Sequence, residues 1–132
     1  MLYADEQPAL SAAMVSTHSK LLGVHLNDGY AKRDDGLMVA SVHHQATTEL
    51  LYQIYKDGYK GVIYFDTFPD ATGLDPVLEC ETNINTVEKI LKIVDNLLIN
   101  NELTLSMQNQ DAVRSQQIFN KVLFDSNLLD NE

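Results

Sequence analysis

The chain has 132 residues, with 45% hydrophobic and 21% charged side chains and a net charge of −10. This length suits one domain, and the composition is ordinary for a globular protein. The negative charge argues against a sequence-independent nucleic-acid binder, which needs a basic surface to neutralise phosphates. It also argues against docking on an anionic membrane. We therefore expect neither nucleic acid nor membrane as a partner.

Cysteine usage and hydropathy indicate a cytoplasmic location. Cys80 is the only cysteine, so an internal disulfide is excluded, and a reducing compartment is the natural expectation. No apolar run approaches the roughly 20 residues that span a bilayer. Residues 1–6 lack the basic start and apolar stretch of a secretion signal.

The first half of the chain predicts a helix, a strand and a second helix. Good helix formers follow Pro8 and predict a helix over residues 8–17. A short apolar run then ends at His25 and is followed by the turn residues Asn27, Asp28 and Gly29. Residues 27–41 read as a loop. Helical spacing of apolar residues begins near position 47, and Gly58 is a typical helix stop.

The second half begins with the clearest strand, a continuous apolar run over residues 60–66, as expected of a strand buried on both faces. Residues 67–75 contain proline and glycine and read as a loop. An amphipathic helix is predicted from residue 83 or 85 to 99, and another over 109–125. The end of the chain, residues 127–132, is expected to fray.

The predicted order is therefore α, β, α, β, α, α, and the strand–helix–strand unit demands a parallel pair with a right-handed crossover. Two parallel strands are not a finished sheet, because their faces need cover and their edges need partners. A complete (β/α)₈ barrel takes about 250 residues. We expect one α/β domain over residues 1–132 that forms part of a larger barrel, with residues 108–132 as a C-terminal helix and tail.

Each predicted strand ends on a side chain that binds metals, His25 in the first and Asp66 in the second. In parallel α/β proteins, ligands gather at the carboxyl ends of the strands. An imidazole and a carboxylate at one rim are the beginning of a divalent-metal site. Two ligands do not complete such a site, which again indicates part of a larger enzyme.

Three blocks of sequence, residues 24–29, 32–41 and 58–66, resemble in order the C-terminal part of xylose-isomerase-like barrels. The bacterial sugar isomerases related to xylose and rhamnose isomerase are the most similar group. The resemblance covers roughly residues 1–98 and implies that the two strands are the seventh and eighth of a TIM barrel. The last helix and the tail carry no recognisable motif.

The resemblance also implies a ligand set. His25 matches the metal ligand that ends the seventh strand, and Asp66 matches the carboxylate that ends the eighth. Asp34 matches the first aspartate of a loop pair that binds a second, catalytic metal. The next loop aspartate falls on Gly36, a departure that puts the second metal in doubt, with Asp35 as a substitute if the loop shifts. The ligands of the earlier strands would lie before residue 1.

Enzymes of this group interconvert an aldose and its ketose by a metal-assisted hydride shift. The resemblance therefore implies a monosaccharide substrate and a divalent cation, Mn²⁺, Mg²⁺ or Co²⁺, which carboxylates with one imidazole suit. Lys32 and Asn27 are the candidate substrate-binding residues. Because ligands are missing, we expect the chain alone to be inactive, and to form a homo-oligomer or pair with a chain that carries the earlier strands.

Plainer interpretations stand beside these. His25 is also readable as a hydrogen-bonded histidine at a strand end, Asp66 as a turn former, and Asp34 with Asp35 as solvated charge. Asp28 reads as a turn residue, and the adjacent His43 and His44 as loop or helix-cap residues. Alternative functions are a sugar epimerase of the same superfamily, which would need a glutamate where Asp66 stands, and a non-catalytic association module. The sugar, the native metal and the oligomeric state are left open.

Overall fold

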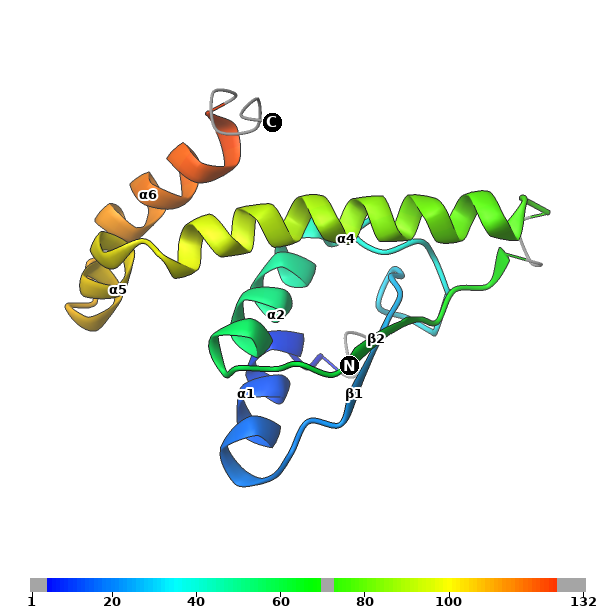
Figure 1. Cartoon of the computed structure of the whole chain (residues 1–132), viewed down its shortest axis with the longest axis horizontal. Coiled ribbons are helices and arrows are strands. Elements are labelled where there is room, and N and C mark those ends of the chain that lie inside the picture. The colour runs from blue at the N-terminus through cyan, green and yellow to red at the C-terminus, as the bar shows by residue number, and fades with distance from the viewer. Residues whose placement is uncertain (1–4, 70–72, 126–132) are drawn as a thin grey trace. The chain divides into compact units, whose positions relative to one another are not determined.

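The computed structural model describes residues 5–69 and 73–125, so the predicted fraying of residues 127–132 lies outside the described residues. The fold is a mixed α/β arrangement with a two-stranded parallel sheet (Figure 1). In chain order, the elements are α1 (Pro8–His18), β1 (Gly23–Leu26), α2 (His44–Lys56), β2 (Val62–Phe65), α4 (Pro76–Leu98), α5 (Asn101–Gln108) and α6 (Ala112–Phe124).

The described chain divides into two compact units, residues 1–91 and 92–132. The first holds both strands, α1, α2 and most of α4. The second holds the end of α4 with α5 and α6. Each unit has buried apolar side chains: Ala12, Val24, Leu26, Val39, Leu50, Leu51, Ile54, Val87 and Ile90 in the first, and Val94, Leu97, Leu103, Ile118 and Val122 in the second.

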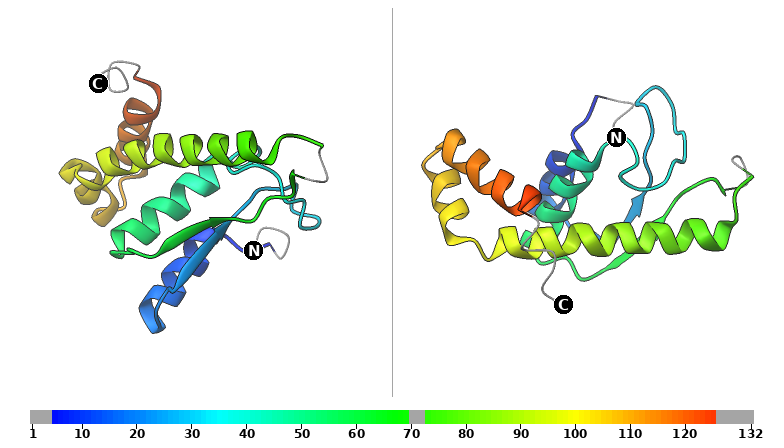
Figure 2. Two further views of the ribbon diagram at one scale, coloured as in Figure 1. Left: turned by 45° about the vertical axis from the view of Figure 1, so that its right-hand side comes forward. Right: turned by 90° about the horizontal axis from the view of Figure 1, so that it is seen from above.

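The two strands run parallel, as the strand–helix–strand order requires. His25 pairs with Tyr64 and Leu26 with Phe65. The backbone N–H of Asp66 donates to the carbonyl of Leu26 at 2.9 Å, so the ladder extends one residue beyond β2. α1 and α2 pack against each other and lie together to one side of the strands (Figures 1 and 2).

The two faces of the sheet differ in burial. Val24 and Leu26 of β1 are buried, while the alternate residues Gly23 and His25 are exposed. The predicted burial of the second strand on both faces is wrong for this structure, because Val62 is 56% and Tyr64 53% exposed. A continuous apolar run fits such a strand only when both faces are covered. Here one face carries no covering element among the described residues.

α1 and α2 begin and end close to the positions that the sequence signals predict. Pro8 occupies the first turn of α1, where its missing N–H costs no hydrogen bond. α2 begins at His44, three residues before the predicted position, because His43 already serves as its N-cap. Gly58, with φ of +80°, lies directly beyond the C-cap of α2.

The start of α4 was predicted too late. The helix begins at Pro76, directly after the predicted loop of residues 67–75. Asp75 stabilises this start, because its side chain accepts a hydrogen bond from the N–H of Val77 at 2.9 Å. An aspartate followed by proline is a strong helix start. One face of the helix buries two polar side chains, Glu79 and Asn83, before its apolar stripe.

The predicted helix over 109–125 is confirmed as α6, which begins at Ala112, whereas α5 before it was not predicted. Asn100 caps α5 by accepting from the N–H of Leu103 at 2.9 Å, and Asp111 caps α6 by accepting from the N–H of Arg114 at 2.9 Å. Gln110, between the two helices, has a φ of +55°. The turn at positions 109–111 therefore separates two helices that pack against each other.

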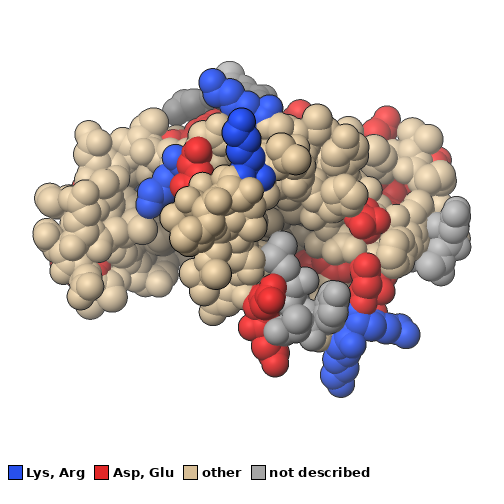
Figure 3. Space-filling model, turned by 90° about the horizontal axis from the view of Figure 1, so that it is seen from below, with Lys and Arg blue, Asp and Glu red and all other residues tan. Residues whose placement is uncertain are grey.

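Within the described residues, none of the helices is both long and apolar enough to cross a membrane. Figure 3 shows one face of the molecule, on which lysine and arginine side chains occur in separate places with acidic side chains close by.

Candidate functional site

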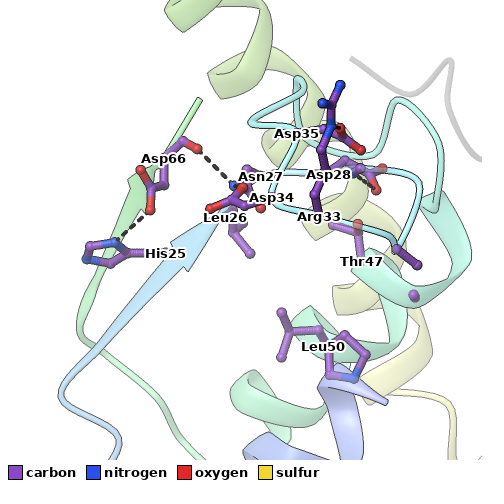
Figure 4. Close-up of a pocket in the computed structure, with 14 residues that line it drawn as sticks. His25, Leu26, Asn27, Asp28, Arg33, Asp34, Asp35, Thr47, Leu50 and Asp66 are labelled. Carbon is purple, nitrogen blue, oxygen red and sulfur yellow. Dashed lines mark hydrogen bonds and ion pairs between the residues drawn. The ribbon is translucent and has the colours of Figure 1, made fainter. Parts of the chain in front are cut away.

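A pocket of about 200 Å³ lies where the carboxyl ends of β1 and β2 meet the loop of residues 27–36 and the start of α2 (Figure 4). Four aspartates and one arginine line it, which makes its wall predominantly acidic. The lining residues are Pro8, His25, Leu26, Asn27, Asp28, Gly29, Ala31, Arg33, Asp34, Asp35, Ala46, Thr47, Leu50 and Asp66.

The structure brings His25 and Asp66 together, although the two are far apart in sequence. Nδ1 of His25 lies 3.5 Å from Oδ2 of Asp66, and both side chains are more than half exposed. The strand alternation that buries Val24 and Leu26 turns His25 to the open face, where its ring lies 5.1 Å from that of Tyr64. Asp66 directly follows β2, so the parallel register delivers both groups to one rim.

Asn27 connects this pair to the neighbouring loop. Its Nδ2 donates to Oδ1 of Asp34 at 2.8 Å and to the backbone carbonyl of Asp66 at 3.0 Å. Oδ1 of Asp34 also accepts from the N–H of Gly36 at 3.3 Å. Asn27 therefore links Asp34 to the end of β2, and Figure 4 shows Asp34 beside Asn27.

Asp35 has a different set of contacts. Its carboxylate accepts from the N–H of Tyr30 at 2.8 Å and from Nε of Arg33 at 2.8 Å. These hydrogen bonds, with the charge of the guanidinium, hold the pKa of Asp35 below its ordinary value. Figure 4 shows Asp35 beside Arg33 and apart from Asp66. Asp35 thus stabilises its own loop.

Asp28 is the buried carboxylate of the site, with 3% of the residue exposed. It accepts from the N–H of Gly29, Val42 and His43 and lies 2.8 Å from Nδ1 of His43. Burial by itself would raise the pKa of Asp28, but these hydrogen bonds outweigh it and hold the pKa below the ordinary value. An ionised carboxylate only accepts, so His43 donates through Nδ1–H.

The sequence assigned Asp28 to a turn and His43 to a loop or cap. Both assignments agree with the geometry, but the link between the two residues was missed. Backbone hydrogen bonds between Asp28 and Leu37 also close the intervening loop, as an isolated antiparallel bridge. A contact between two residues that are fifteen positions apart produces no hydrophobic periodicity from which it could be predicted. The turn sequence Asn27-Asp28-Gly29 was the only signal near it.

Gly36 is the position where the resemblance places a second loop aspartate. Its φ is +60°, and a Cβ built there would collide with the ring of Phe68. The N–H of Phe68 donates to the carbonyl of Gly36 at 2.9 Å, so the two loops are held together at this point. A side chain at position 36 would therefore displace the ring of Phe68, and the neighbouring Asp35 carboxylate contacts Tyr30 and Arg33.

The two candidate substrate-binding residues differ. Asn27 lines the pocket, and both of the hydrogen bonds described for it are made to other parts of the site. Lys32 is exposed and does not line the pocket, whereas its neighbour Arg33 does. His44, one residue beyond the cap, is exposed with its Nδ1 3.0 Å from the carbonyl of Ala40.

The imidazole and carboxylate groups of the site are ligand types that hard or borderline divalent cations prefer, but they form only part of a ligand set. Arg33 and His43 engage Asp35 and Asp28, and Asn27 and Gly36 donate to Oδ1 of Asp34, which leaves His25 and Asp66 as the pair of donors that face each other. Two ligands of one cation lie at most about 4.4 Å apart when each bond is about 2.0–2.2 Å, so the 3.5 Å between His25 and Asp66 is compatible with a shared ion. Among the described residues, however, no three His, Cys, Asp or Glu side chains gather closely enough to hold a metal.

The fold and the site define an α/β protein with an acidic pocket at the carboxyl ends of two parallel strands. No known protein-family model matches this chain, and no curated protein is significantly similar to it.

Proposed function

We propose that this chain supplies the seventh and eighth strands, with their flanking helices, of a metal-dependent sugar-isomerase barrel. Its His25 and Asp66 would be donors to one divalent cation, and Asp34 would be a donor to a second. The observation that carries the proposal is the 3.5 Å approach of His25 to Asp66 across adjacent parallel strands. Such rims are where ligands bind in parallel α/β proteins.

The shape of the sheet supports the same proposal. β1 and β2 expose the face that carries Gly23, His25, Val62 and Tyr64. In a barrel, that face would be the interior, where side chains of further strands cover it. Placing His25 on the interior face is what a metal ligand in a barrel requires.

The residues present fit part of a ligand set. His25 and Asp66 would hold one cation together with donors from further strands, Asp34 would be a donor to a second cation, and Asp28 and Asp35 would stabilise the surrounding loop. When bound, the cation would polarise a sugar carbonyl and align its neighbouring oxygens. The acidic wall offers hydrogen-bond acceptors to sugar hydroxyls, whereas it would repel an anionic substrate.

The proposal predicts weak binding of Mn²⁺ that depends on His25 and Asp66. Mn²⁺ bound to the full chain is measured from its electron paramagnetic resonance signal. His25→Ala and Asp66→Asn should each weaken the affinity at least about ten-fold, the loss that even outer partners of metal ligands produce. His18→Ala and Asp95→Asn, at exposed positions outside the pocket, are the matched controls and should leave it unchanged.

Equal Mn²⁺ affinity in the wild type and in all four variants would contradict the proposal.

Conversion of an aldose to its ketose is then assayed with added Mn²⁺. We expect no turnover by the chain alone, because the two donors His25 and Asp66 leave the cation incompletely held. Turnover by the chain alone that survives Asp66→Asn would show that the reaction does not use this site.

A further inference from the structure

We propose that Asp28 and His43 form a general-base pair in a second pocket, where Nε2 of His43 takes a proton from a water molecule that attacks a small uncharged ester. This inference goes beyond the proposed function and involves no cation. The second pocket has a volume of about 600 Å³. It is lined by Gln7 and Pro8 before and at the start of α1, and by residues 42–46 and Glu49 at the start of α2.

The buried carboxylate of Asp28 determines which ring nitrogen of His43 is able to act as a base. Nδ1 of His43 lies 2.8 Å from Oδ1 of Asp28, whose side chain is 1% exposed. Three backbone N–H groups, those of Gly29, Val42 and His43, also donate to this carboxylate and favour its ionised form. The neutral ring therefore carries its proton on Nδ1 and a lone pair on Nε2.

The second pocket gives access to this lone pair. The His43 side chain is 34% exposed and lines the pocket, and among the described residues its ring is hydrogen-bonded through Nδ1 alone. A histidine that a buried carboxylate orients through one nitrogen, with the other nitrogen open to a pocket, has the geometry of a general base. Asp28 would act as the positioning residue of this pair and His43 as its catalytic residue.

The lining of the pocket indicates which molecule loses the proton. None of the described residues that line it carries a hydroxyl or a thiol, so it offers His43 no side-chain nucleophile. Water is then the nucleophile. It gives one proton to Nε2 while its oxygen bonds to the carbonyl carbon of the ester. The bond from that carbon to the alkoxy oxygen breaks next, and the departing alcohol takes the proton back from the imidazolium ring.

The same lining favours an uncharged acyl substrate. The first turn of a helix presents backbone N–H groups without intrahelical partners, and at the start of α2 these suit a carbonyl oxygen that gains charge. The carboxylate of Glu49, which also lines the pocket, disfavours an anionic substrate. We therefore expect a small neutral ester in this pocket.

Hydrolysis of ethyl dichloroacetate by the full chain, with a metal chelator present, tests the base. Ethoxide leaves poorly, so the attack of water is favoured over attack by the ring itself. His43→Gln should lower the rate of acid release, followed by titration at constant pH, about ten-fold or more. A glutamine side chain still has an N–H donor for Asp28 but is no base. His18→Gln, at an exposed position outside the pocket, is the matched control and should keep the wild-type rate.

The role of Asp28 is tested by the position of the ring proton. The N–H groups of Val42 and His43 both donate to Oδ2 of Asp28, so the single amide oxygen of Asp28→Asn should occupy that side. Its amide nitrogen then faces Nδ1 of His43, which has to accept, and the ring proton moves to Nε2. Correlation of ¹H and ¹⁵N signals of the histidine rings reports this change. Asp28→Asn should then hydrolyse the ester as slowly as His43→Gln.

Three results would overturn the inference. The first is an equal rate in the wild type and in His43→Gln, or an equal loss in His43→Gln and His44→Gln, which would make the effect one of any exposed imidazole. The second is a neutral His43 ring that carries its proton on Nε2 in the wild type. The third is a proton moved to Nε2 in Asp28→Asn without loss of rate. If Asp28→Asn does not fold, the wild-type spectrum and the His43→Gln rate still decide.

Discussion

Nδ1 of His43 lies 2.8 Å from Oδ1 of Asp28, so a buried carboxylate near the end of β1 is joined to the N-cap of α2. The same carboxylate accepts from the N–H groups of Val42 and His43, at 2.8 and 2.7 Å. The loop that carries Asp34 and Asp35 lies between these two ends. The Asp28–His43 link therefore determines where the loop is anchored, and the candidate site depends on it.

The first prediction concerns the stability of this anchor. Asp28→Ala should lower the free energy of unfolding by about 2–4 kcal/mol, because it leaves buried N–H donors without an acceptor and His43 without its partner. Urea denaturation followed by circular dichroism measures the change. Asp95→Ala, at an exposed position, should stay within about 0.5 kcal/mol of the wild type. Equal effects of the two substitutions would show that the Asp28 contacts do not stabilise the fold.

The second prediction is a pH dependence with a defined sign. The pKa of Asp28 is lower in the folded chain than its ordinary value of about 3.9, so ionised Asp28 favours folding. Its contribution is fully present above the ordinary pKa and is lost as the pH falls through the lower, folded pKa. The urea midpoint of the wild type should fall on acidification below about pH 4. The fall should be shallower in Asp28→Asn, with Asp35 supplying part of what remains.

A third prediction separates steric clash from backbone strain at glycine. Gly36→Ala meets both a positive φ and the ring of Phe68, and should cost about 2–4 kcal/mol. Gly58→Ala is the matched control, since its φ is also positive but nothing lies within 4 Å of the added Cβ, and it should cost about 1–2 kcal/mol. Urea denaturation of both variants measures the difference. If the two variants lost the same free energy of unfolding, the ring of Phe68 would have to move aside at little energetic cost.

The fourth prediction addresses the open face of the sheet. Val62 and Tyr64 are exposed apolar residues on a strand whose outer edge carries no further strand among the described residues. Such surfaces associate, so we expect the chain to form oligomers at high concentration, measured by sedimentation velocity. Val62→Lys should shift the population toward monomer. Val113→Lys, at a 70% exposed position on α6, should not. A wild-type chain that stays monomeric would contradict the prediction.

Much of the fold was readable from local signals. Pro8 and the capping region near Gly58 marked α1 and the end of α2, and two apolar runs separated by a helix predicted the parallel strand pair that the structure has. The late start assigned to α4 was avoidable, because Asp75 and Pro76 together are a helix-start signal. α5 was missed although Asn100, which caps it, is a residue type that favours helix N-termini.

The candidate site was only partly readable. Its strand-end members, His25 and Asp66, follow from topology, because parallel strands present their carboxyl ends at one edge. The hydrogen bonds within the loop of residues 27–36 cannot be predicted from the hydrophobic periodicity of the sequence. The separate engagement of Asp34 by Asn27 and of Asp35 by Arg33 depends on the loop path, which two backbone bonds between Asp28 and Leu37 fix. Burial of β2 was over-predicted because an apolar run does not tell which faces are covered.

The central claim is that His25 and Asp66 bind one cation, and a crystal of the full chain grown with Mn²⁺ tests it most directly. Anomalous diffraction at the manganese absorption edge locates the ion without assuming its ligands. The account predicts a peak within about 2.3 Å of both an imidazole nitrogen of His25 and a carboxylate oxygen of Asp66. A manganese peak elsewhere in the chain, with His25 and Asp66 contacting only each other, would contradict it.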